Sequence, residues 1–295
     1  MKKGNGMLWV FILNLTFSML ELMGGVLTGS TAILSDGVHD LGDAVSVGVA
    51  YAFERKSKKA PDERYTYGYA RYSAVGGLVT VAVLLLGSLV AVYNAIYRLI
   101  NPAEIDHGGM IALAVVGLCV NLLSALLMHR GESLNRRAVR LHVLEDVLGW
   151  AVVLVGAVIM KLTGLSVLDP ILSIATSGFV IINAVKLLKD ILDVILESAP
   201  KGVSVKEIRE HLLELDGVAD VHHIHLWTLD GESGCATVHV VFNGSPKQVK
   251  AEVKRELGEH GIGHCTVELE ALGEECCEMS CRAEAPLHSH RHRHK

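Results

Sequence analysis

Two segments of the sequence each pair a histidine with an aspartate four residues further on. The first, SDGVHDLGD at residues 35–43, contains His39 and Asp43, and the second, HVLED at residues 142–146, contains His142 and Asp146. In an α-helix, residues four apart lie on one face, one turn above the other. Two such helices could therefore present two imidazoles and two carboxylates to one ion. This donor set suits a tetrahedral divalent cation such as zinc.

Both pairs lie in apolar segments, where a carboxylate is costly to bury. On insertion scales, an aspartate at the middle of a membrane helix costs about 2.5–3.5 kcal/mol. Asp40 and Asp43 must therefore face protein, water or an ion. Two carboxylates and two neutral imidazoles around a divalent cation carry no net charge, and two protons restore that balance when the ion leaves. The pattern predicts a site that exchanges metal for protons; a polar cluster that joins two helices is the structural alternative.

The composition is that of a membrane protein with a soluble part attached. The 295 residues are 51% hydrophobic and have a mean hydropathy of +0.39. Six apolar segments, each long enough to cross a bilayer, lie near residues 7–28, 32–53, 74–97, 110–128, 139–162 and 167–188. Lysines and arginines gather in the loops after the second and fourth segments, so the positive-inside rule predicts six spans with both termini in the cytoplasm. A re-entrant segment in place of one span is the alternative.

The chain after residue 198 has the composition of a small soluble domain. A helix over 203–215, strands over 219–229 and 235–242, a helix over 246–260 and a strand over 264–271 give the order αββαβ. This order is typical of a ferredoxin-like α+β sandwich. We therefore predict an α-helical membrane protein with six transmembrane helices in residues 1–198, a ferredoxin-like cytoplasmic domain in 199–273, and a flexible tail in 274–295.

Cysteine usage points to a reducing compartment. The six cysteines are too few and too unevenly spaced for a secreted disulfide framework. The tail combines thiols with imidazoles at Cys276, Cys277, Cys281, His288, His290, His292 and His294. Such a segment could capture zinc or copper(I), and an idle tail is the alternative.

Histidines also gather in the predicted soluble domain. Regular alternation places His223 and His225 on one face of the first strand and His222 on the other. His239 follows on the second strand, with Glu268 and Glu270 on the last. Exposed histidines on a hydrated sheet are the alternative to a metal site here.

These motifs together resemble the cation diffusion facilitator family, most closely its zinc-transporting branch. The resemblance covers residues 7–272 and rests on the two HxxxD pairs, SDGVHDLGD, YTYGYARYS at residues 65–73, and the αββαβ domain. It implies a homodimeric, proton-coupled exporter of divalent metal, in which the soluble domain dimerises. In this family, histidine at the position of His39 is associated with a preference for zinc.

The resemblance also implies which residues bind metal. The transport-site ligands correspond to His39, Asp43, His142 and Asp146. The family's cytoplasmic binuclear zinc site corresponds by position to His222, His239 and Glu270, with Glu268 where other members have histidine. Some members have a further site between spans two and three; here tyrosines replace its histidines around Asp62, so that site is predicted to be absent.

The sequence therefore predicts a Zn²⁺/H⁺ antiporter that exports zinc across the plasma (inner) membrane, with zinc as both transported substrate and regulatory ligand. Its predicted partners are a second copy of the chain, divalent metal ions, protons and membrane lipid, and no nucleic acid. Export of cadmium, cobalt, iron(II) or manganese is the nearest alternative, followed by a membrane metal sensor that does not transport. A metalloenzyme is disfavoured because the HExxH motif is absent and the two His–Asp pairs fill four coordination positions.

Overall fold

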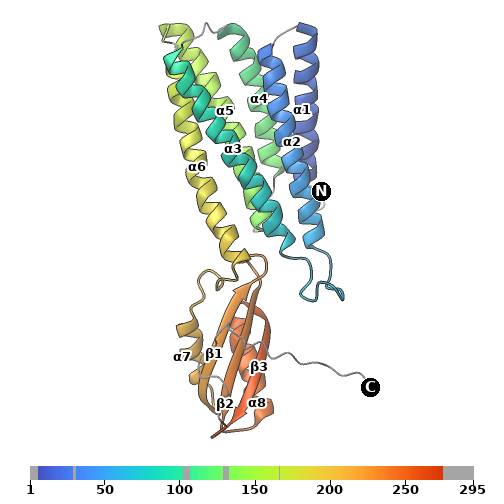
Figure 1. The fold of residues 1–295 in the computed structure, drawn as a ribbon, viewed down its shortest axis with the longest axis vertical. Coiled ribbons are helices and arrows are strands. Elements are labelled where there is room, and N and C mark those ends of the chain that lie inside the picture. Colours follow the sequence, from blue (N-terminus) through green and yellow to red (C-terminus); the bar gives the residue numbers. More distant parts are fainter. Residues whose placement is uncertain (1–5, 29–30, 102–106, 129–132, 166, 275–295) are drawn as a thin grey trace, which may run out of the picture. The chain divides into compact units, whose positions relative to one another are not determined.

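A computed structural model describes residues 6–28, 31–101, 107–128, 133–165 and 167–274, which form six long helices followed by a small α/β unit (Figure 1). The chain divides into two compact units: residues 1–196 together with 229–232, and residues 197–228 together with 233–295. Each unit is described by itself below.

The first unit consists of long, mostly apolar helices. They are α1 (Gly6–Thr28), α2 (Thr31–Ser57), α3 (Tyr72–Ile100), α4 (His107–Leu127), α5 (Leu134–Thr163) and α6 (Leu168–Ile195). Within the described residues, α1, α3, α5 and α6 contain segments long and apolar enough to cross a membrane, and α4 contains a shorter apolar stretch. The chain is therefore an integral membrane protein with four clear spans. The prediction of six spans is supported for these four.

Helix α5 joins two packed clusters of side chains. On one side, α5 contributes Val139 and Val143 to a cluster with residues of α1 and α2. On the other, Leu134 and Ala138 pack with residues of α3 and α6. The Asn135 amide donates a 2.6 Å hydrogen bond to the Ala50 carbonyl of α2. A Cβ atom at Gly76 of α3 would lie only 2.8 Å from the Asn135 side chain, so glycine there permits this approach.

The second unit is a three-stranded sheet covered on one face by two helices. Its elements are α7 (Val205–Leu213), β1 (Val218–Thr228), β2 (Gly234–Phe242), α8 (Pro246–Glu259) and β3 (Ile262–Ala271), which is the αββαβ order expected from the sequence. The strand order is β1-β2-β3, with β1 antiparallel to β2 and β2 parallel to β3.

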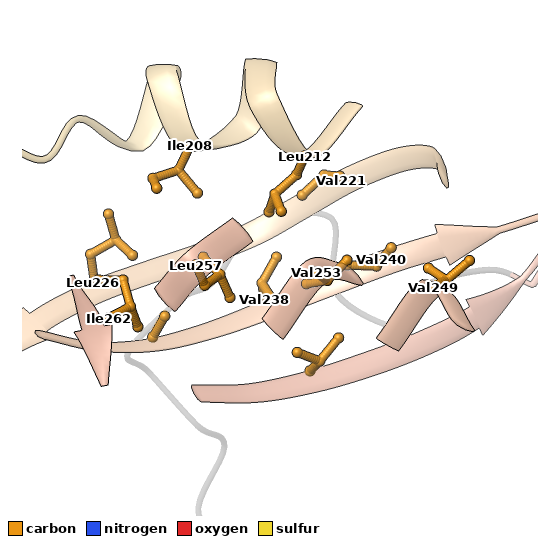
Figure 2. Packing of buried hydrophobic residues seen from close by; sticks show 12 residues of the cluster. Ile208, Leu212, Val221, Leu226, Val238, Val240, Val249, Val253, Leu257 and Ile262 are labelled. Carbon is orange, nitrogen blue, oxygen red and sulfur yellow. The ribbon is translucent and has the colours of Figure 1, made fainter. Parts of the chain in front are cut away.

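The hydrophobic core of this unit lies between the helices and the sheet (Figure 2). Ile208 and Leu212 of α7 and Val253 and Leu257 of α8 are almost fully buried. Along β2, Val238 and Val240 belong to the same core. His239 lies between them and therefore points to the opposite face of the sheet.

The structure of β1 differs from the expectation that His222 and His223 lie on opposite faces of the strand. The β1–β2 pairing shifts register between His222 and His225, and His223 has a positive φ of 47°. The shift is a β-bulge: between these two pairs, β1 has one residue more than β2. The extra residue interrupts the regular alternation of side chains along β1. As a result, the rings of His222 and His223 both lie within 5.5 Å of the His239 ring, measured between centroids. The prediction that they point to opposite faces is wrong.

Candidate metal sites

One group of potential ligands lies inside the helical unit. Asp43 of α2 and His142 and Asp146 of α5 each offer one ligand atom, and these atoms all lie within 4.8 Å of one another. The His142 side chain is 3% exposed, and its Nε2 atom lies 3.9 Å from Asp146 Oδ2. This Nε2 atom is buried and has no hydrogen-bond partner among the described residues. A buried nitrogen without a partner, beside two carboxylates, fits the role of a cation ligand.

The structure thus brings together three of the four residues predicted from the HxxxD pairs. The fourth, His39, belongs to α2 one turn before Asp43, and its side chain lies outside the described residues. Helical geometry places residues four apart on one face of α2.

The neighbouring carboxylate of α5 has a different partner. Ser88 of α3 donates a hydrogen bond of 3.2 Å to Glu145 Oε1. Glu145 therefore links α5 to α3, whereas Asp146, the next residue, lies near Asp43. The i,i+4 spacing from His142 predicts Asp146, and not Glu145, as the ligand.

A second feature that holds α2 against α5 was not predicted from the sequence. Glu54 of α2 is 5% exposed and its Oε1 lies 2.9 Å from Arg136 Nε of α5. It also accepts a 3.0 Å hydrogen bond from the Ser133 hydroxyl and lies 3.4 Å from the Lys58 ammonium. About 80 residues separate Glu54 from its partners on α5, so no local pattern could reveal the contact.

A second group of potential ligands lies on the sheet of the α/β unit. His222, His239 and Glu270 offer ligand atoms within 4.8 Å of one another. His239 Nδ1 lies 2.6 Å from Glu270 Oε1, and His222 Nε2 lies 3.2 Å from Glu270 Oε2. The buried Glu270 carboxylate thus faces one imidazole with each oxygen.

Glu268 lies at the edge of this group. Its Oε2 atom is 3.5 Å from His239 Nε2, but its side chain is 65% exposed. Along β3, Val267 belongs to the core, so Glu268 and Glu270 do not share its face. Both acids therefore lie on the face of the sheet that carries His239, and Glu270 is the one enclosed between histidines.

The loop between α2 and α3 is held together by Asp62. This carboxylate accepts hydrogen bonds from the Tyr69 hydroxyl at 2.6 Å, the Tyr65 amide at 2.9 Å and the Lys59 ammonium at 3.1 Å. These donors favour the ionised form and hold the pKa of Asp62 well below its ordinary range. The aspartate that the sequence singled out here thus orders the loop.

The remaining predictions concern cysteines and the tail. Among the described residues, Cys119, Cys235 and Cys265 form no disulfide. The tail residues Cys276, Cys277, Cys281, His288, His290, His292 and His294 lie outside the described residues.

The fold and the first site define a class: a helical integral membrane protein with an acidic, histidine-containing group among its helices and a small α/β unit after them. The chain belongs to the cation efflux family. The family's "Cation efflux transmembrane domain" matches residues 7–196, and "Cation efflux protein, cytoplasmic domain" matches residues 200–272. The family resemblance seen in the sequence is thereby confirmed.

Named relatives cover almost the whole chain. It is 34% identical to the zinc transporter ZitB of Yersinia pseudotuberculosis over 98% of this chain and 95% of the relative. It is 33% identical to ZitB of Escherichia coli over 98% and 93%. It is 31% identical to the cadmium, cobalt and zinc/H(+)-K(+) antiporter of Bacillus subtilis over 88% and 86%.

Proposed function

We propose that this protein exports zinc from the cytoplasm in exchange for protons. The observation that carries the proposal is the convergence of Asp43, His142 and Asp146 from two helices of the membrane unit. Two relatives are named zinc transporters and a third an antiporter of cadmium, cobalt and zinc, which supports transport and not enzymatic chemistry. Imidazole and carboxylate donors suit zinc, although cadmium and cobalt remain the competing substrates.

The transport site consists of His39, Asp43, His142 and Asp146. Zinc bound by two aspartates and two neutral histidines gives a site without net charge, which a region of low dielectric constant favours. Protons take the place of the metal when it leaves, because the same oxygen and nitrogen atoms bind either cation. Proton entry on one side and metal release on that side are therefore two halves of one exchange.

The surrounding architecture follows from the same proposal. Helices α1–α6 all cross the plasma (inner) membrane, with both termini and the basic loops on the cytoplasmic side. The chain acts as a homodimer, and its cytoplasmic unit contributes to the dimer contact. The group of His222, His239, Glu268 and Glu270 binds regulatory zinc in this unit.

The test is zinc flux into sealed proteoliposomes under an imposed pH gradient. Asp43→Asn and Asp146→Asn keep the size of each side chain and remove its charge, so we expect gradient-driven flux to fall at least 10-fold in both. Glu145→Gln is the matched control on the same helix, since an amide oxygen can still accept from Ser88; it retains most of its flux.

Two outcomes would contradict the proposal. Flux that is unaffected by both substitutions would remove the site from the transport path. Zinc binding without any flux in the unaltered protein would identify a membrane metal sensor. Replacing zinc by cadmium, cobalt or manganese in the same vesicles decides which metal is transported.

A further inference from the structure

A third group of potential ligands joins the two helices of the α/β unit. His211 is at the end of α7, and Glu256 and His260 are at the end of α8. His211 Nδ1 lies 2.8 Å from His260 Nε2 and 3.6 Å from Glu256 Oε1. His260 Nε2 lies 3.4 Å from the same Glu256 oxygen. The same three atoms, His211 Nδ1, Glu256 Oε1 and His260 Nε2, therefore lie near one another in all three pairs.

The packing of the two helices fixes this meeting point. Leu212 and Leu257 are fully buried in the core beneath α7 and α8. His211 adjoins Leu212, and Glu256 adjoins Leu257 on α8. Glu256 and His260 are four residues apart, so they lie on one face of α8, one turn above the other. This Glu-x₃-His spacing is the signal in the sequence that could have indicated the group.

Two of the three distances in this group match those between ligands around one small cation. Nitrogen and oxygen atoms bound tetrahedrally to zinc at about 2.0–2.2 Å lie about 3.3–3.6 Å from each other. Both contacts of Glu256 Oε1, at 3.4 and 3.6 Å, fall at these values. The two imidazole nitrogens, at 2.8 Å, would need to separate by about half an ångström. Their side chains are 41% and 20% exposed, which leaves room for that adjustment and for a water ligand.

This group is separate from the histidines on the sheet. His222, His239 and Glu270 occupy the face of the sheet opposite the core, whereas His211 and His260 belong to the helices that cover the other face. No residue is shared between the two groups.

We propose that His211, Glu256 and His260 form an additional zinc site that joins α7 to α8. Two imidazoles, one carboxylate and a water complete a tetrahedral zinc site, and the water position keeps the ion exchangeable. Zinc binding replaces a single hydrogen bond between two histidines by bonds from both helices to one ion. It therefore restrains the ends of α7 and α8 relative to each other.

Zinc titration of the full-length protein in detergent tests this site. The background carries Asp43→Asn and Glu270→Gln, which weaken the other two candidate sites, and every variant retains the tail. We expect His211→Ala and His260→Ala each to bind about one zinc ion fewer per chain than the background. His264→Ala replaces an exposed histidine of β3 and serves as the control, with unchanged stoichiometry.

Hydrogen exchange of the same samples provides a local measurement. In the background protein, zinc should slow amide exchange in peptides that cover residues 205–213 and 256–260, and this protection should disappear in His211→Ala and His260→Ala. If both variants keep the zinc stoichiometry and the protection, the group is a hydrogen-bonded histidine pair and the proposal is wrong. Transport activity is not part of this readout, so failure here leaves the proposed export function standing.

Discussion

At the scale of residues, several single carboxylates make contacts that join different parts of the chain. Asp146 lies near Asp43 and His142, while Glu145 accepts a hydrogen bond from Ser88. Glu270 faces two histidines, and Asp62 gathers four donors in the loop after α2. Each of these acids lies beside hydrogen-bond donors or beside other residues that could bind the same cation.

The lowered pKa of Asp62 leads to a prediction about how the order of the loop between α2 and α3 depends on pH. Its pKa is lowered in the folded state, chiefly by the Tyr69 hydroxyl, so its contribution to loop order is fully present above the ordinary pKa of about 3.9. That contribution is lost only as the pH falls below this value towards the lowered one. We expect protection of residues 58–71 from hydrogen exchange, corrected for intrinsic rates, to stay constant between about pH 5 and 8.

Asp62→Asn provides the comparison for this loop. An amide accepts hydrogen bonds more weakly than a carboxylate and cannot form an ion pair with Lys59. Hydrogen exchange in residues 58–71 should therefore be faster than in the unaltered protein throughout about pH 5 to 8. Tyr67→Phe, which changes an exposed side chain of the same loop, serves as the control. Protection that titrates near neutral pH would contradict the role given to Asp62.

At the scale of elements, helix α5 links most of the membrane unit. It supplies two ligands of the candidate transport site, packs in both apolar clusters, and holds α2 through Asn135 and Arg136. Glu54 lies eleven residues beyond Asp43 on α2, and Arg136 lies ten residues before Asp146 on α5. At 1.5 Å per residue, the Glu54 contact is therefore about 15 Å along the helices from the site.

Glu54→Gln tests this contact between α2 and α5. The substitution leaves the largely buried Arg136 guanidinium without its anion, and we expect a loss of about 1–3 kcal/mol in stability. Thermal unfolding in detergent measures it. Lys58→Ala removes the more exposed cation of the same group and should cost under about 1 kcal/mol. Equal effects of the two substitutions would show that Arg136 is not the partner that matters.

At the scale of the whole molecule, the chain combines a membrane unit and an α/β unit, each with its own candidate metal groups. Under the proposed function, zinc on the sheet of the α/β unit strengthens the homodimer and so reports the zinc concentration. Glu270 is central to that group because each of its oxygens lies near one histidine.

We expect Glu270→Gln to weaken zinc-dependent dimerisation of the full-length protein in detergent by about 10-fold or more, since an amide binds zinc far less well than a carboxylate. Analytical ultracentrifugation with and without zinc measures this effect. Glu268→Gln, at the exposed edge of the group, should have a smaller effect. If zinc promotes dimerisation equally in the unaltered protein, Glu270→Gln and Glu268→Gln, then the group of His222, His239, Glu268 and Glu270 is not the regulatory site.

The sequence by itself determined the features that depend on local spacing. Apolar segments predicted the membrane unit, and alternation and turn residues predicted the αββαβ order. The HxxxD spacing predicted that His142 and Asp146 share a helix face, and the structure places both near Asp43. These properties follow from the periods of the helix and the strand, which act over a few residues and are visible in one segment at a time.

Only the tertiary structure decided which distant segments meet. It placed Glu54 against Arg136, brought His211 to the end of α8, and put His222 and His223 together near His239 through a bulge. Such contacts depend on how helices and strands pack across tens of residues, and a single register shift reverses the face on which a side chain lies. Packing of whole elements, and not local pattern, therefore determines these contacts.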